Sequence, residues 1–158
     1  HTHGERRIES GEPVVLDFGT RVDGYPSDQT RTVVFDGKPV EEFRRVHDIV
    51  RRAQAAAIET VEAGVTAGDV DAAAREVIEA AGYGDRFIHR TGHGVGLDIH
   101  EEPTIVGGSD RLLEPTMVFS VEPGVYLPGE FGVRIEDLVV VTADGCERLN
   151  TTSREWRI

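Results

Sequence analysis

Residues 39–82 read PVEEFRRVHDIVRRAQAAAIETVEAGVTAGDVDAAAREVIEAAG. Apolar side chains recur there every three or four residues, at Phe43, Val46, Val50, Ala53, Ala57 and Val61 and then at Val70, Ala73, Ala74, Val77, Ile78 and Ala81. This spacing predicts two amphipathic helices. Gly64 ends the first helix, Thr66 and Asp69 resemble a capping box for the second, and Gly82 stops it.

Short β-branched runs lie on both sides of the helical pair. Residues 14–18 and 30–35 precede it and predict a hairpin, with Asp17 and Asp28 near the two strands. Four further strands are predicted after Gly84, at residues 87–90, 117–122, 132–136 and 138–142. Strands, then helices, then strands favour an α+β domain with a mostly antiparallel sheet over an alternating α/β fold.

Composition sets limits on the partners. The 158 residues suit one domain, and 29 acidic against 17 basic residues give a formal net charge of −12. That charge argues against nucleic acid or an anionic membrane as the main partner and favours cations. Cys146 has no partner for an internal disulfide, which fits a structural residue and a cytoplasmic location. The chain opens on His1 without Met or a secretory signal, so we expect a part of a longer protein.

Four acidic residues, Asp17, Asp28, Glu122 and Glu136, lie in or beside stretches predicted to be buried strands. Buried carboxylates are costly unless they are paired or metal-bound, and four together repel one another. Each alone could instead cap backbone N–H groups at a strand end or turn, Asp28 above all. Four at once favour a cation site.

His93 lies among three glycines, which we expect to let the backbone approach a ligand closely. His89 and His100 flank it and could face the same cavity, although either alone could be a hydrogen-bonded structural histidine. The glycine spacing does not match the dinucleotide-binding fingerprint, and serine-hydrolase, zinc-helix and paired-cysteine motifs are missing.

Carboxylates with one imidazole and no thiolate favour manganese, cobalt or zinc. Five ligands are too many for one catalytic zinc. Two divalent ions that share bridging carboxylates and a water would use all five, and would generate a hydroxide for hydrolysis at neutral pH.

Five motifs in order extend this interpretation: LDFG (16–19), GYPSDQTRT (24–32), GHGVGL with HEEP (92–97, 100–103), VEPGVY (121–126) and VRIED (133–137). Together they resemble the metal-site motifs of the family M24 metallopeptidases, which have the pita-bread fold, and they span nearly the whole chain. The resemblance implies a mostly antiparallel curved sheet with flanking helices.

The resemblance also implies the metal ligands: Asp17, Asp28, His93, Glu122 and Glu136. Asp28 and Glu136 would bridge the ions, Asp17 would complete one site, and His93 with Glu122 the other. We expect manganese first, with cobalt or zinc as alternatives. A metal-bridging hydroxide would attack the scissile carbonyl, and Glu122 would also shuttle protons.

The remaining matches concern substrate and support. His89 and His100 match histidines that would orient the substrate and stabilise the oxyanion. Tyr126, Arg134 and Arg31 are candidates for support, and a guanidinium at Arg134 can hold a ligating carboxylate through bidentate hydrogen bonds.

The motifs are more similar to the Xaa-Pro peptidase branch, prolidase and aminopeptidase P, than to methionine aminopeptidase. The expected substrate is a peptide with proline in the second position. Two activities, dipeptidase and aminopeptidase, are not separated by these residues. A creatinase-like hydrolase of a non-peptide C–N bond, a non-catalytic binding member of the fold and an acidic cation-storage domain are the alternatives.

One departure from the family concerns a further active-site histidine, for which His1 and His3 are imperfect candidates. Residues 1–158 would be part of a C-terminal catalytic domain whose upstream helices, strand and N-terminal domain are missing. A cut through a closed sheet exposes an apolar face. We therefore expect the piece to need its missing half, as a separate chain or as a second copy in a homodimer, for stability and activity.

Overall fold

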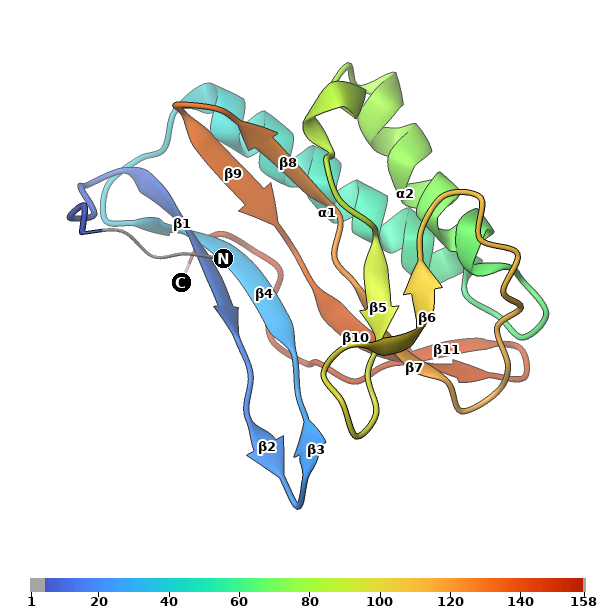
Figure 1. Ribbon diagram of the computed structural model, residues 1–158. Coiled ribbons are helices and arrows are strands. Elements are labelled where there is room, and N and C mark those ends of the chain that lie inside the picture. The colour runs from blue at the N-terminus through green and yellow to red at the C-terminus, as the bar shows by residue number, and fades with distance from the viewer. Residues whose placement is uncertain (1–4, 158) are drawn as a thin grey trace.

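The computed structural model describes residues 5–157, so His1 and His3 lie outside the described residues. It begins with the predicted hairpin: β1 (Glu12–Phe18) pairs antiparallel with β4 (Gln29–Phe35), as Figure 1 shows. The two short strands β2 (Arg21–Val22) and β3 (Tyr25–Pro26) extend its far end and were not predicted.

The helical pair is confirmed. α1 spans Glu41–Thr60 and α2 spans Ala67–Ala80. Thr66 and Asp69 form the predicted capping box, since each side chain accepts a hydrogen bond from the other's backbone N–H. The predicted apolar face of α1 is buried, including Val61 just beyond it. Neither helix in the described part of the chain is long and apolar enough to cross a membrane.

The second half is an antiparallel sheet with strand order β11-β10-β7-β5-β6, beside a β8–β9 hairpin. The strands are β5 (Gly92–Gly94), β6 (Glu101–Ile105), β7 (Val118–Val121), β8 (Gly124–Leu127), β9 (Phe131–Arg134), β10 (Asp137–Thr142) and β11 (Gly145–Arg148). Strands β5, β6, β8 and β11 were not predicted. The class is α+β, as predicted, because every strand pair is antiparallel and the helices are consecutive.

The predicted strand at residues 87–90 is wrong. A short 3-10 helix, η1 (Gly84–Arg86), leads into an irregular segment that reaches β5. Two carbonyls of that segment, those of Phe87 and His89, accept hydrogen bonds from the Arg75 guanidinium. A side chain of α2 therefore satisfies backbone groups that a neighbouring strand would otherwise pair.

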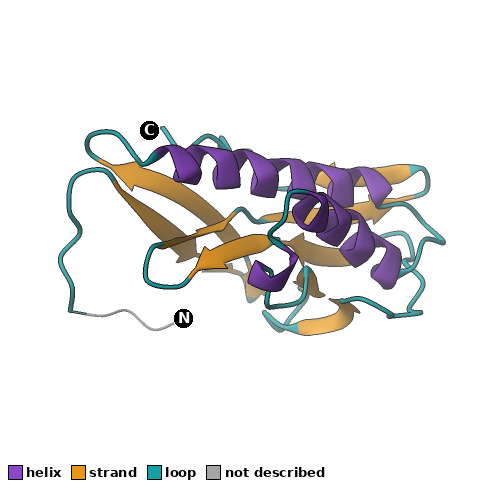
Figure 2. Cartoon of the chain, turned by 90° about the horizontal axis from the view of Figure 1, so that it is seen from above, coloured by secondary structure: helices purple, strands orange, loops and turns teal. Residues whose placement is uncertain are grey.

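Both helices lie on one side of the strands (Figure 2), and the apolar core fills the space between them. β1 leaves part of its apolar face exposed, since Leu16 is 41% and Phe18 54% exposed. In residues 5–157, an open apolar groove of about 750 Å³ runs over β1 and β4, and its lining includes Val14, Leu16, Val33, Phe35 and Trp156. We call this groove the β1–β4 groove.

A buried ion pair joins the two halves of the chain. Arg31 on β4 donates to Asp137 on β10 at 2.6 Å, and Asp137 is fully buried. Gln54 of α1 donates to the other Asp137 oxygen at 3.2 Å, and Arg148 reaches the same oxygen at 3.4 Å. The carboxylate therefore has donors on both oxygens, as a buried charge requires.

We expect Asp137→Asn to lower the free energy of unfolding by about 3–5 kcal/mol, because it leaves the Arg31 guanidinium buried without its counter-charge. Urea denaturation measures the change. The matched control is Asp48→Asn, which breaks exposed ion pairs with Arg51 and Arg52 and should cost less than about 1 kcal/mol. Equal losses in the two variants would contradict the buried pair as a main support of the fold.

Candidate metal centre

Strand register gathers three of the predicted ligands on the face away from the helices. Asp17 lies opposite Thr30 in the β1–β4 pair, and Thr30 forms a β-bridge with Glu136. The β7–β10 register pairs Val121 with Asp137. Continued by one residue, it sets Glu122 opposite Glu136.

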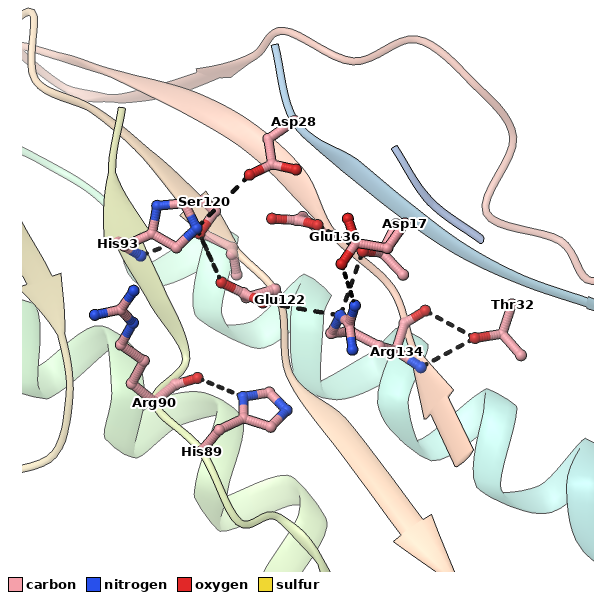
Figure 3. Close-up of polar contacts among 12 residues, drawn as sticks. Asp17, Asp28, Thr32, His89, Arg90, His93, Ser120, Glu122, Arg134 and Glu136 are labelled. Carbon is pink, nitrogen blue, oxygen red and sulfur yellow. Dashed lines mark hydrogen bonds and ion pairs between the residues drawn. The ribbon is translucent and has the colours of Figure 1, made fainter. Parts of the chain in front are cut away.

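Asp28 and His93 complete the group. One ligand atom each of Asp28, His93 and Glu136 lies within 4.8 Å of the other two. His93 Nε2 lies 3.7 Å from Asp28 Oδ2 and 3.3 Å from Glu122 Oε1. Figure 3 shows the imidazole between these carboxylates, with Asp17 on the far side of Glu136. The five predicted ligands thus surround one space.

Two glycines beside His93 lie tightly against neighbouring strands of the sheet. A Cβ at Gly92 would lie 1.8 Å from the Ser120 carbonyl oxygen, and one at Gly94 would lie 2.2 Å from that of Glu102. Any side chain at either position would push β5 away from its neighbours. The glycines therefore allow the tight strand packing that sets the His93 position.

The space is a cavity of about 510 Å³. Its walls combine charged, imidazole and apolar side chains: Asp17, Asp28, Ile88, His89, Arg90, His93, Ile99, His100, Glu122, Tyr126, Arg134 and Glu136. All predicted site residues except Arg31 line it. Sequence reasoning missed Ile88, Ile99 and Arg90, because single side chains on irregular segments carry no periodic signal.

Burial and like charge act on the carboxylates together. Burial, and then the charges of Glu122 and Asp28, raise the pKa of Glu136 to about 8. Burial raises the pKa of Glu122 to about 7, and burial followed by the Asp17 charge raises that of Asp28. Without a cation, ionisation of these three carboxyl groups is unfavourable. A positive charge in the cavity would therefore stabilise the ionised form of all three.

The hydrogen bonding of His93 points the same way. Its Nδ1 lies 3.1 Å from the Gly94 carbonyl oxygen, which can only accept, so Nδ1 carries the hydrogen. Burial lowers the pKa of this imidazole, which favours the neutral ring. Nε2 then presents a lone pair toward the oxygens of Asp28 and Glu122. A lone pair directed at two carboxyl groups fits a divalent cation in the space between them.

Arg134 holds the carboxylates from the side. Its Nη2 donates to Asp17 Oδ2 at 2.5 Å, and its Nε lies 3.8 Å from Glu122 Oε2. The same Nε donates to Thr30 Oγ1 at 3.3 Å, and that hydroxyl donates to Glu136 Oε2 at 2.6 Å. One guanidinium thereby orients three acidic side chains.

A second chain of hydrogen bonds leads from Arg134 to His89. Arg134 Nη1 donates to the Tyr126 hydroxyl at 3.0 Å, and that hydroxyl lies 2.9 Å from His89 Nε2. His89 Nδ1 donates to the Arg90 carbonyl at 2.7 Å, which leaves Nε2 as an acceptor. His100 is exposed at the rim, and its ring stands edge-on to His93 with centroids 4.3 Å apart.

Arg31 lies behind the cavity. Its Nη1 donates to the Glu136 carbonyl at 2.6 Å, so its support reaches the site through backbone. Two hydroxyls that sequence reasoning missed lie nearer: Thr30, described above, and Ser120, which donates to Glu122 Oε1 at 3.1 Å and accepts from His93 N. Each lies two residues from a predicted acidic ligand, so the alternation of side chains along a strand could have indicated it.

Comparison with known proteins gives consistent results. The sequence profile described as metallopeptidase family M24 matches residues 1–143. The Xaa-Pro dipeptidase of Lactobacillus helveticus is 48% identical over 151 residues, which are 96% of this chain and 41% of that protein. The chain therefore spans about two-fifths of the length of such relatives.

Solved structures agree. A crystal structure of recombinant prolidase from Thermococcus sibiricus is 48% identical with a TM-score of 0.96, over 99% of this chain and 42% of that one. The crystal structure of an X-Pro aminopeptidase from Thermotoga maritima is 45% identical with a TM-score of 0.92, over 96% and 43%.

A divalent cation should stabilise the fold through this cluster. With Mn²⁺ at about 100 times its dissociation constant, we expect the melting temperature to rise by roughly 5–10 °C over the chelator-treated protein. Glu136→Gln should abolish most of that rise, because it removes a carboxylate at the centre of the cluster. Differential scanning calorimetry, with elemental analysis of bound metal, measures both.

Glu59→Gln, an exposed change on α1, is the matched control and should keep the full rise. An equal rise in Glu136→Gln would place the stabilising ion elsewhere.

Proposed function

The chain belongs to metallopeptidase family M24, and from that premise we propose that it is the metal-binding part of an enzyme that hydrolyses Xaa-Pro peptide bonds. The fold is the pita-bread fold of the family. The chain spans about two-fifths of the length of its relatives. The observation that carries the proposal is the single cavity on which four carboxylates and the His93 lone pair converge.

Two divalent ions fit the donor set better than one. Asp28 and Glu136 would bridge them, Asp17 would complete one site, and His93 with Glu122 the other. Family membership implies divalent metal. We propose manganese, with cobalt and zinc as alternatives. Among the proposed ligands, carboxylate oxygens outnumber the one imidazole, that of His93, and no thiolate lines the cavity.

Bound ions would supply Lewis-acid polarisation of the scissile carbonyl and a water acidic enough to attack at neutral pH. Glu122 would take the proton of that water and pass it to the leaving nitrogen. Its two oxygens are suited to this, because Oε1 accepts from Ser120 while Oε2 lies 3.8 Å from Arg134 Nε and is held less tightly.

His89 and His100 would handle the substrate. The neutral His89 ring offers Nε2 as an acceptor, so we assign it the orientation of substrate N–H groups, in exchange with Tyr126. His100, exposed at the rim, would donate to the oxyanion. The apolar Ile88 and Ile99 in the same wall suit a pyrrolidine ring.

We expect the manganese-loaded protein, at the full length of its relatives, to cleave Xaa-Pro dipeptides and to leave Xaa-Ala dipeptides largely intact. Glu122→Gln should lower kcat by about 10²–10⁴-fold, because it removes the proton shuttle. Chromatographic assay of released proline measures the rate. Longer Xaa-Pro peptides distinguish dipeptidase from aminopeptidase.

The matched control for that series is Glu114→Gln, an exposed change away from the cavity that should leave kcat unchanged. Hydrolysis of creatine-like substrates alone would favour the C–N hydrolase alternative. Bound metal without hydrolysis of any peptide in the series would favour a non-catalytic binding member of the fold.

We also propose that residues 1–158 belong to a C-terminal catalytic domain and that another segment of a longer polypeptide covers the β1–β4 groove. The length of the relatives and the exposure of Leu16 and Phe18 support this. We propose a cytoplasmic location because the half-buried thiol of Cys146 is free.

Leu16→Gln tests the covering segment. In the 158-residue chain this change should alter the free energy of unfolding by less than about 0.5 kcal/mol, because the side chain is exposed. In a polypeptide of the relatives' length it should cost about 1.5–3 kcal/mol, because Leu16 would be buried. Urea denaturation of both proteins measures the difference.

Leu112→Gln, on an exposed loop, should be neutral in both lengths. If the 158-residue chain instead sedimented as a dimer that Leu16→Gln dissociated, a second copy would be the occupant of the groove.

A further inference from the structure

An ion pair on α2 lies outside the cavity and holds the segment that enters it. Asp71 and Arg75 are one helical turn apart, and Arg75 donates through Nε and Nη2 to the two Asp71 oxygens, each at 2.9 Å. This bidentate geometry fixes the guanidinium plane. Asp71 is only 1% exposed, which is unusual for a helix carboxylate of an acidic protein.

The same guanidinium binds the irregular segment 87–91. Its Nη1 and Nη2 donate to the carbonyls of Phe87 and His89, each at 3.2 Å, and its Cζ lies 4.2 Å from the Phe87 ring centroid. No ladder hydrogen bonds hold residues 87–90, since they form no strand. Arg75 therefore does for this backbone what a neighbouring strand does elsewhere in the sheet.

Asp71 holds the other end of the segment. Its Oδ1 accepts from the buried Thr91 hydroxyl at 2.7 Å. The Thr91 carbonyl in turn accepts from the backbone N–H of Glu122 at 2.8 Å. The Asp71 carboxylate is thus connected to the backbone of Glu122 through two hydrogen bonds. Its partner Arg75 is connected to the backbone of His89 through one.

We propose that Asp71 and Arg75 are positioning residues, which set the segment 87–91 so that His89 and Glu122 face the substrate in the cavity. The inference rests on the proposed hydrolysis for its kinetic part only. Neither residue lines the cavity, so both act through backbone. Arg75 is central because its guanidinium donates hydrogen bonds to two carbonyls and one carboxylate at once. A lysine ammonium could make only some of these bonds.

The test uses the metal-loaded protein at the full length of its relatives. We expect Arg75→Gln to lower kcat for an Xaa-Pro dipeptide by about 10- to 100-fold, with bound metal unchanged. Arg75→Lys should recover part of that loss. Hydrogen–deuterium exchange, read by mass spectrometry, should be faster at residues 88–92 and 122 in Arg75→Gln, in the absence of any substrate. Asp71→Asn should speed exchange at Thr91 and Glu122 in the same way.

Arg52→Gln, which breaks an exposed i,i+4 pair on α1, is the matched control and should change neither readout. Unchanged exchange at residues 88–92 in a folded Arg75→Gln protein would overturn the inference, as would a loss of kcat with no recovery in Arg75→Lys. A wild-type protein without Xaa-Pro hydrolysis would refute the proposed function alone, because the exchange measurement still decides whether the pair holds the segment.

Discussion

Mutual repulsion among buried carboxylates is the constraint on which the rest of this structure depends. Asp28, Glu122 and Glu136 share one cavity, and burial with like charge raises the pKa of each. Such a cluster stays together only where the surrounding fold over-determines the position of every member. The antiparallel registers, the Arg134 guanidinium and the hydroxyls of Thr30 and Ser120 do this. The site is therefore prepared for cations by the protein's own hydrogen bonds.

Much of this was predictable from the sequence, because the signals are local. The spacing of apolar residues predicted both helices, and Thr66 with Asp69 predicted the cap that forms. Five separate motifs predicted which residues would meet, and four carboxylates with His93 do lie around one space. That meeting needs sheet register, which the resemblance carried and the residue pattern alone did not.

The features that were not predicted share one physical cause: each depends on what packs against the segment. Residues 87–90 have the composition of a strand, but Arg75 takes the hydrogen bonds that a strand would make. Leu16 and Phe18 have the pattern of a buried strand, but residues 5–157 leave them 41% and 54% exposed. The glycines beside His93 have a packing role that was not expected, because they admit the neighbouring strands. In each case the local pattern was right and the partner was not visible in it.

Glu136 and Asp137 are adjacent acids with opposite surroundings. Glu136 faces the cavity, and Asp137 faces α1 and the Arg31 guanidinium, because neighbouring side chains of an extended strand point to opposite sides. Replacing Glu136 by Asp, or Asp137 by Glu, would change the length of the side chain by a single methylene group. Loss or gain of one residue between Arg134 and Asp137 would instead turn the Glu136 carboxylate toward the helices and the Asp137 carboxylate toward the cavity. Over the evolution of this segment, length should be held more strictly than composition.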